Sequence, residues 1–333
     1  MSRRIQILKS HIHIVLALLI LLGTAFYSLI FVFSGREPRQ PPGTNIRSDG
    51  VSGTVGAGTE IMEPYGDQSE TQDAERDALT TLISLDYSDI SRGSLVLVNY
   101  AHSFDVPAEY NFVSIAGAMT QSYRVVNDQL ALCGTAIGPL NDMMDAFYAE
   151  TGLRDVTIRS AFRGYESQQA ALDNWIATVG QDEALRFAAL PGHSEHHTGL
   201  AVDFGIYDDG NIRQFTGTGA HAWFRYNAHR FGFILRYTEE FSPITGVADE
   251  PWHFRYVGLP HSYFIFGRGW ALEEYIAYIM NLGPGQTLRG YYNGAAYEVF
   301  FSRDTEIAIP IDAEYTISGS NIDGFIVTIR VAE

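Results

Sequence analysis

The longest apolar stretch of the chain lies near its start, at residues 14–33. It contains 20 residues and no charge, which is the length that a helix needs to cross the hydrocarbon core of a bilayer. Three basic residues precede it, Arg3, Arg4 and Lys9, and the cytoplasmic flanks of membrane helices carry such charge. The pattern predicts a single-pass anchor in the cell membrane, a cytoplasmic N-terminus at residues 1–13, and an extracytoplasmic location for the rest of the chain.

A cleaved signal peptide is the alternative for this stretch, but the apolar part of a signal peptide usually has only about 7–15 residues. The next segment, residues 34–72, is rich in Gly, Pro, Ser, Thr and acidic residues and contains few large apolar ones. Such a composition buries too little surface to fold and is typical of an extended linker. We therefore expect a disordered stalk at residues 34–72.

From residue 73 the chain has the mixed periodicities of a globular domain. Leu140, Met143, Met144 and Phe147 recur at the spacing of one helix face, and Gly152 follows them as a helix stop. Other segments have the length and apolar character of short strands or the period of helices. Together these patterns predict helices at residues 140–151, 166–177 and 270–282, and strands at residues 95–99, 156–160 and 200–204.

The pattern changes at residue 284. The segment at residues 284–333 alternates β-branched and aromatic residues with Asn-Gly, Asp-Gly and Gly-Ser turns. Residues 325–331 form its clearest strand pattern. We expect either a small β-rich C-terminal module or strands that pack on the main domain, and the sequence of this segment contains no grouping of residues that indicates chemistry.

Charge and rare residue types exclude several classes of protein. The chain has 22 Lys and Arg against 39 Asp and Glu, and this net charge of −17 argues against a nucleic-acid partner. Its only lysine is Lys9, too near the start to serve a phosphate-binding loop, a Ser-x-x-Lys site or a Schiff base. Its only cysteine is Cys133, which excludes internal disulfides and cysteine-rich metal sites. Any bound metal must therefore be held by His, Asp or Glu.

Histidines gather in one short segment, where His193, His196 and His197 lie within nine residues of a glycine- and proline-bounded stretch. Asp203 follows inside an apolar run, where a buried carboxylate is costly unless it is paired or binds a metal. Spacing alone leaves the choice of histidine open. A helix would place His193 and His197 on one face, but Pro191, Gly192 and Gly199 argue against a helix here. An extended segment would point both histidines away from His196.

A second group of polar residues occurs at residues 249–253, where Glu250 precedes His253 by three residues. A hydrolytic zinc site needs three protein ligands, an open position for water, and a carboxylate that takes a proton from that water. His196, Asp203 and His253 are candidates for the ligands, and Glu250 is a candidate for the base. The alternative for all four is an ordinary structural role in turns, caps or salt bridges.

The order of these residues resembles a known family. The motif is Ser194-x-His196-x-x-Gly199-x-Ala201-x-Asp203, followed by Glu250-x-Trp252-His253. It resembles the VanY-type metallo D-alanyl-D-alanine carboxypeptidases, which belong to a wider group with lysostaphin-like enzymes and the hedgehog signalling domain. Residues 160–168 resemble the serine–aromatic–arginine segment of this family, and residues 252–258 and 272–276 resemble its closing segments. The resemblance covers roughly residues 91–282.

The resemblance implies one zinc ion per chain, with the ligands His196, Asp203 and His253 and the general base Glu250. It implies that Arg163 binds or polarises the substrate near its scissile carbonyl and terminal carboxylate, a task that suits the rigid guanidinium fork. Three further positions match residues of the family's pocket, and we expect them to contact substrate: Ser160, Gln168 and Ser194. The chain departs from the family at Gly164, where relatives often have Ser, and at His197, where they often have Gln.

We therefore expect an α+β fold in which a small, mainly antiparallel sheet at residues 73–283 carries the zinc site and is flanked by helices. The expected function is a membrane-anchored zinc D-alanyl-D-alanine carboxypeptidase that removes the terminal D-Ala from peptidoglycan stem peptides. Related alternatives are an L,D-peptidase or a cross-bridge endopeptidase of the cell wall. Alternatives of another class are a zinc-bearing wall-binding module without turnover and a scaffold that acts through its stalk and C-terminal module. The carboxylate of Glu250 argues against a pure binding module, which needs no base.

Overall fold

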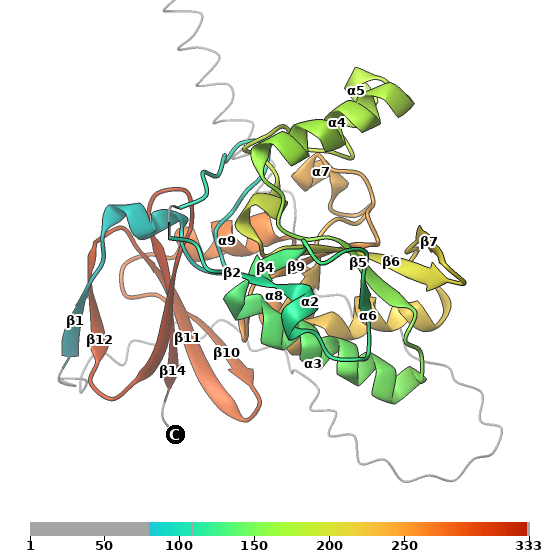
Figure 1. Cartoon of the computed structure of the whole chain (residues 1–333). Coiled ribbons are helices and arrows are strands. Elements are labelled where there is room, and N and C mark those ends of the chain that lie inside the picture. The colour runs from blue at the N-terminus through green and yellow to red at the C-terminus, as the bar shows by residue number, and fades with distance from the viewer. Residues whose placement is uncertain (1–79, 108, 332–333) are drawn as a thin grey trace, which may run out of the picture. The chain divides into compact units, whose positions relative to one another are not determined.

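The computed structural model describes residues 80–107 and 109–331 (Figure 1). The anchor predicted at residues 14–33 and the stalk predicted at residues 34–72 lie outside these residues. Within the described part of the chain, no helix is both long and apolar enough to span a membrane.

A mainly antiparallel sheet carries three of the residues that the sequence singled out, Ser160, Asp203 and His253. Among the described residues its strands follow the order β3-β5-β6-β9-β8, with β7 paired to β6, and the β3–β5 pair alone is parallel. The strands are β3 (Arg124–Val125), β5 (Val156–Ser160), β6 (Ala201–Asp208), β7 (Asn211–Gln214), β8 (Phe233–Leu235) and β9 (His253–Tyr256). The expected mixed fold of helices and a mainly antiparallel sheet is confirmed.

Helices flank this sheet, and the longest of them, α3, covers one of its faces. The apolar stripe predicted for α3 is buried in the same core as Val202 and Phe204 of β6. Because side chains alternate along a strand, burial of these two residues turns Asp203 to the opposite face. The described helices are α2 (Ile115–Ala118), α3 (Gly134–Thr151), α4 (Tyr165–Val179), α5 (Gln181–Ala184), α6 (Trp223–Asn227), α7 (Ser242–Thr245), α8 (His261–Arg268) and α9 (Leu272–Met280), with the 3₁₀ turns η1 (Tyr87–Ser91), η2 (Glu195–Thr198), η3 (Gly219–Ala222) and η4 (Ala228–Phe231).

The C-terminal segment forms a second, antiparallel sheet, as its alternating pattern predicts. This sheet has the order β10-β11-β14-β13 among the described residues, and two strand pairs, β1–β12 and β2–β4, stand apart from it. The remaining strands are β1 (Thr80–Ser84), β2 (Phe112–Ser114), β4 (Ala131–Cys133), β10 (Leu288–Tyr292), β11 (Ala295–Ser302), β12 (Glu306–Pro310), β13 (Glu314–Gly319) and β14 (Phe325–Val331). Figure 1 shows β1, at the start of the described chain, beside β12 of the C-terminal segment.

The prediction of a strand at residues 95–99 is wrong. Leu95 to Val98 are buried, but Leu95 lies in a turn and the segment pairs with no strand of the described chain. Its backbone bonds instead to groups distant in the sequence: the Leu95 N–H donates to the Ser318 hydroxyl, and the Leu97 N–H donates to the Ser320 carbonyl. Apolar composition indicated burial correctly, whereas the partners could not be read from local pattern.

Candidate functional site

Strand register brings two of the predicted metal ligands together. Asp203 of β6 lies directly opposite His253 of β9, and Ser160 of β5 lies opposite Asp203 on the other side, next to a β-bulge. Side chains of directly opposed residues on one face lie about 5 Å apart, so the register alone makes this a polar cluster. All three residues project from the sheet face opposite to the α3 core.

His196 reaches the same point from the 3₁₀ turn η2. The Ser194 hydroxyl caps this turn by accepting from the His196 N–H, and Gly199 ends it at a φ of 62°. A Cβ on Gly199 would lie 2.6 Å from the ring of Phe112 and 2.9 Å from the Cys133 nitrogen, so this position admits only glycine without rearrangement. Residues 195–198 thus form a short 3₁₀ helix, although Pro191, Gly192 and Gly199 argue against one. This helix directs His196 to the cluster and resolves the choice that spacing left open.

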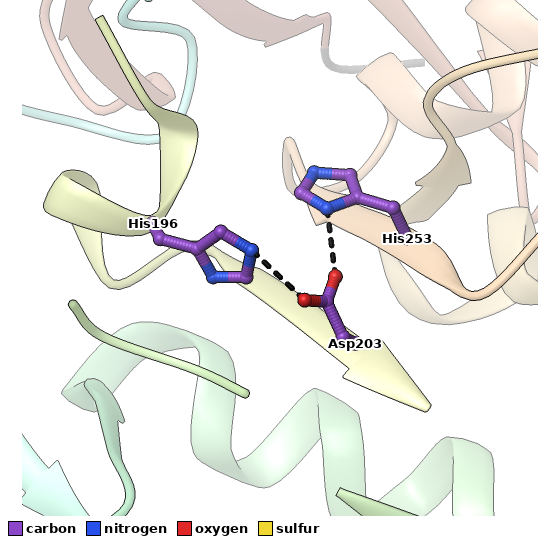
Figure 2. A group of neighbouring side chains, drawn as sticks. All are labelled: His196, Asp203 and His253. Carbon is purple, nitrogen blue, oxygen red and sulfur yellow. Dashed lines mark hydrogen bonds and ion pairs between the residues drawn. The ribbon is translucent and has the colours of Figure 1, made fainter. Parts of the chain in front are cut away.

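Figure 2 shows the Asp203 carboxylate between the two imidazoles, with one oxygen toward each ring. His196 Nε2 lies 3.2 Å from Asp203 Oδ2, and His253 Nδ1 lies 2.9 Å from Asp203 Oδ1. One ligand atom from each of the three residues falls within 4.8 Å of the others. Two nitrogens and one carboxylate oxygen at this spacing are a donor set that fits zinc.

The remaining ring nitrogens have partners that fix the direction of each imidazole. His196 Nδ1 donates to the Ala161 carbonyl at 2.7 Å, which leaves the Nε2 lone pair free to bind a metal. His253 Nε2 donates to Glu195 Oε2 at 3.2 Å, which directs Nδ1 toward Asp203. Metal-binding histidines commonly donate their other N–H to a carbonyl or carboxylate in this way.

The charges of the cluster also suit a cation. Burial would raise the pKa of Asp203, but the neighbouring His196 and His253 hold it well below its ordinary value. Burial would lower the pKa of His253, but its hydrogen bonds to Asp203 and Glu195 raise that pKa to about 9. The Nδ1 proton that this favours is the one that a metal ion must replace, so metal binding should release a proton.

Glu250 lies beside this cluster, with Oε2 4.0 Å from His253 Nδ1. The residue is only 6% exposed, and its backbone N–H donates to the Tyr237 carbonyl. Burial is the main cause that raises the pKa of Glu250 to about 8, and the negative charge of Asp203 adds to it. A cation held by the three ligands would act in the opposite direction and favour the carboxylate that a general base requires.

Arg163 points toward the same cluster and is held by two of the predicted pocket residues. Its guanidinium donates to the Ser160 hydroxyl at 2.6 Å and to Gln168 Oε1 at 2.9 Å, and one nitrogen lies 3.7 Å from Asp203 Oδ2. The Gln168 amide in turn donates to the Ala189 carbonyl. Ser160 and Gln168 therefore fix the position of the guanidinium, and the substrate contacts expected of them stay a prediction.

All eight residues that the sequence singled out line one cleft of about 1000 Å³: Ser160, Arg163, Gln168, Ser194, His196, Asp203, Glu250 and His253. The two other histidines of the crowded segment have structural partners instead. His197 accepts from the Gly192 N–H through Nε2 and bonds the Arg163 carbonyl through Nδ1, and His193 bonds the Asn99 carbonyl. The departure from the family at His197 thus lies outside the ligand cluster.

A buried charge network behind His253 was not predicted from the sequence. Glu195, inside the histidine segment, accepts from Arg236 and Arg255 as well as from His253. Arg236 also pairs with Glu273 of α9. A signal for the network was present, because an arginine two residues after His253 in an apolar strand must find a buried acid or carbonyl partner.

Comparison with known proteins agrees with this geometry. Residues 129–259 match the family model described as VanY, D-alanyl-D-alanine carboxypeptidase. A D-alanyl-D-alanine carboxypeptidase of Enterococcus faecium is 30% identical over 246 residues, which cover 72% of this chain and 76% of that protein. The bifunctional D-Ala-D-Ala dipeptidase and D-Ala-D-Ala carboxypeptidase VanXYC of Enterococcus gallinarum is 40% identical over 146 residues, covering 42% of this chain and 74% of that protein.

Among solved structures, the fold is similar to that of the vancomycin resistance D,D-dipeptidase VanXYg, in complex with a D-Ala-D-Ala phosphinate analogue. The TM-score is 0.68 at 31% identity, and the match covers 76% of this chain and 100% of the VanXYg chain. The recognition from sequence motifs is confirmed. The chain belongs to the VanY family of D-alanyl-D-alanine carboxypeptidases.

Proposed function

We propose that this protein is a zinc-dependent D-alanyl-D-alanine carboxypeptidase that removes the terminal D-Ala from peptidoglycan stem peptides. The observation that carries the proposal is the convergence of His196, Asp203 and His253 beside Glu250 and Arg163 in one cleft. Family membership supports the reaction class, and the donor set supports the metal. Bound by the three ligands, zinc would polarise the scissile carbonyl and acidify the attacking water.

Arg163 binds the terminal carboxylate of the substrate in this proposal. Its guanidinium lines the cleft and is already oriented by Ser160 and Gln168, so little side-chain entropy is lost when a carboxylate arrives. A charged fork at this position selects peptides with a free C-terminus. It therefore favours a carboxypeptidase over an endopeptidase that cuts within a cross-bridge.

Glu250 moves the proton. Its carboxylate takes a proton from the attacking water and gives it to the nitrogen of the departing D-Ala, which leaves as a neutral amine. The carboxylate is largely buried and lies at the edge of the ligand cluster, beside the place where the three ligands would hold the metal. The products are the shortened peptide, which ends in a new carboxylate, and free D-alanine.

The size of the cleft supports a peptide longer than a dipeptide. Ligand pockets usually have about 300–1,000 Å³, and this cleft of about 1000 Å³ lies at the upper end. Beyond the ligand cluster it is lined by Tyr100, Trp175 and Leu190. These walls favour a stem peptide over free D-Ala-D-Ala.

The test of this function is product identification by mass spectrometry. The full-length protein is incubated with a UDP-muramyl pentapeptide, with the corresponding tetrapeptide and with D-Ala-D-Ala. A D,D-carboxypeptidase converts the pentapeptide into tetrapeptide and D-alanine, and it leaves the tetrapeptide intact. Cleavage of the tetrapeptide would instead assign an L,D-carboxypeptidase, and zinc binding without any product would assign a binding module.

We further propose that residues 14–33 anchor the protein in the cell membrane and hold the domain at residues 73–283 on the outside. The uncharged apolar run and its basic N-terminal flank support this topology. A protease added to intact cells should digest the domain and leave a short anchored fragment. Protection of the domain until the cells are lysed would contradict the topology.

A further inference from the structure

The charge network behind His253 consists of two carboxylates and two guanidinium groups in the described chain: Glu195, Glu273, Arg236 and Arg255. Glu195, Arg236 and Arg255 are each no more than 2% exposed. Glu195 Oε1 accepts from Arg236 Nε at 2.8 Å and from Arg255 Nη1 at 2.9 Å. Its other oxygen, Oε2, is left for His253 Nε2.

The network has no part in the chemistry proposed above, yet both of its arginines make several further hydrogen bonds. Arg236 is bound at its other end by both oxygens of Glu273, at 2.6 and 2.9 Å. Arg255 also donates to the backbone carbonyls of Ser94 and Val96. Two opposite pairs of charges cancel, so a fully buried carboxylate can remain ionised at this place.

We infer that Glu195 is a positioning residue for the zinc site, which it serves by fixing the proton of His253 on Nε2 and thereby the lone pair on Nδ1. This inference rests on the proposed function, because it concerns the metal that His253 binds there. The two oxygens of Glu195 have different partners. Oε1 accepts from the two arginines, and Oε2 can accept a hydrogen bond from His253 only if Nε2 is protonated.

Replacement of Glu195 by glutamine would remove the charge of the side chain and reverse its hydrogen bond with His253. The two arginines only donate, so the amide oxygen must face them and the amide NH₂ must face His253. An NH₂ group requires an acceptor at Nε2, which moves the imidazole proton to Nδ1. That nitrogen then has no lone pair for zinc, although the shape of the side chain has hardly changed.

Glu273→Gln is the matched control. Glu273 neutralises the same Arg236 from the other side, but His253 bonds Glu195 and not Glu273. Both substitutions remove one buried carboxylate from one network, so both should lower the melting temperature of the metal-free protein. They should differ in zinc affinity if the role of Glu195 is positioning and not stability alone.

The experiment measures zinc affinity by competition with a chromophoric chelator on the full-length protein, together with thermal unfolding of the metal-free form. We expect Glu195→Gln to weaken zinc binding by about 10–100-fold and Glu273→Gln to change it by less than about threefold. The charge-balanced double variant Glu195→Gln, Arg255→Met keeps Arg236 to orient the amide. It should fold more readily and show the same weakening as Glu195→Gln.

Zinc affinity of Glu195→Gln within about threefold of wild type would overturn the inference, as would equal weakening by Glu273→Gln. These results can be distinguished from failure of the proposed function. If the proposed function is wrong, the wild-type protein itself binds no zinc, and the positioning role of Glu195 is then wrong as well.

Discussion

Asp203 is the residue on which the geometry of the site depends most. Its two oxygens lie near His196 and His253, and Arg163 approaches one of them at 3.7 Å. Its backbone lies in the strand that separates the apolar core from the cleft. A single carboxylate therefore links the two other proposed metal ligands to the group that we propose for substrate binding.

At the residue scale, Arg163→Lys tests recognition of the terminal carboxylate. Lysine keeps the charge but loses the fork and the bonds to Ser160 and Gln168, so kcat/KM should fall by about 10²-fold. Wild type should lose a similar factor when the substrate carries a C-terminal amide. The two losses should be far from additive in steady-state assays, because they remove the same interaction. Fully additive losses would place Arg163 elsewhere in the reaction.

The order of residues in a motif predicted the proposed ligands, base and substrate-binding arginine, and the structure brings these residues together in one cleft. The sequence did not show how they are supported. Ser160 and Gln168 bond Arg163, a contact that the sequence did not predict, and the substrate contacts expected of them stay a prediction. Glu195 was not singled out, because its partners Arg236 and Arg255 lie more than 40 residues further along the chain. Contacts at that distance leave no periodic signal in the sequence.

At the scale of elements, prediction succeeded where a segment carries its own pattern. Strands β5 and β14 have the predicted bounds, and α4 extends the predicted helix by one residue at its start and two at its end. Helix α3 begins six residues earlier than predicted, at Gly134. Residues 95–99 lack a strand because side chains and distant carbonyls satisfy their backbone, which no local pattern reveals.

Helix α8 joins two other elements through one neutral histidine. His261 Nδ1 bonds the hydroxyl of Tyr275 in α9 at 2.7 Å, and Nε2 lies 3.2 Å from the hydroxyl of Thr328 in β14. Burial lowers the pKa of His261 from 6.5 to about 3. Below pH 6.5 the unfolded chain therefore binds a proton that the folded protein rejects, and the free energy of unfolding decreases as the pH falls.

This predicts a pH dependence of stability at the element scale. From pH 6 to pH 4, His261 should contribute a loss of about 1.4 kcal/mol per pH unit in the free energy of unfolding. In His261→Asn that contribution disappears, so denaturant unfolding curves should show a shallower dependence on pH, whatever the absolute stability of the variant. An unchanged slope would mean that His261 is protonated in the folded state.

At the scale of the whole molecule, the C-terminal segment is part of the fold that carries the site. Val299 and Ile326 share a buried core with Leu272 and Ile276 of α9. Strand β12 pairs with β1, and Asn321 donates to the carbonyls of Leu97 and Ser103. The same stretch around Leu97 supplies the carbonyls that hold Arg255, so the segment indirectly supports the proposed metal site.

Deletion of residues 284–333 should therefore abolish cooperative folding, because it exposes the α9 core and leaves β1 without a partner. Asn321→Gly is the milder variant, since glycine adopts the φ of 60° found there but cannot donate to the two carbonyls. It should lower the free energy of unfolding by about 2 kcal/mol in denaturant titrations. A truncated protein that unfolds cooperatively and releases D-alanine at the wild-type rate would instead make the segment an independent module.

The most direct test of the central claim is metal removal and return in the D-alanine release assay. The full-length wild type, Glu250→Gln and the exposed neighbour control Asp249→Asn are stripped with a chelator and then given zinc. We expect wild type and Asp249→Asn to lose and regain activity, and Glu250→Gln to bind zinc but to remain at least about 10²-fold slower. D-alanine release that persists in the verified metal-free protein, or full activity of Glu250→Gln, would contradict the account.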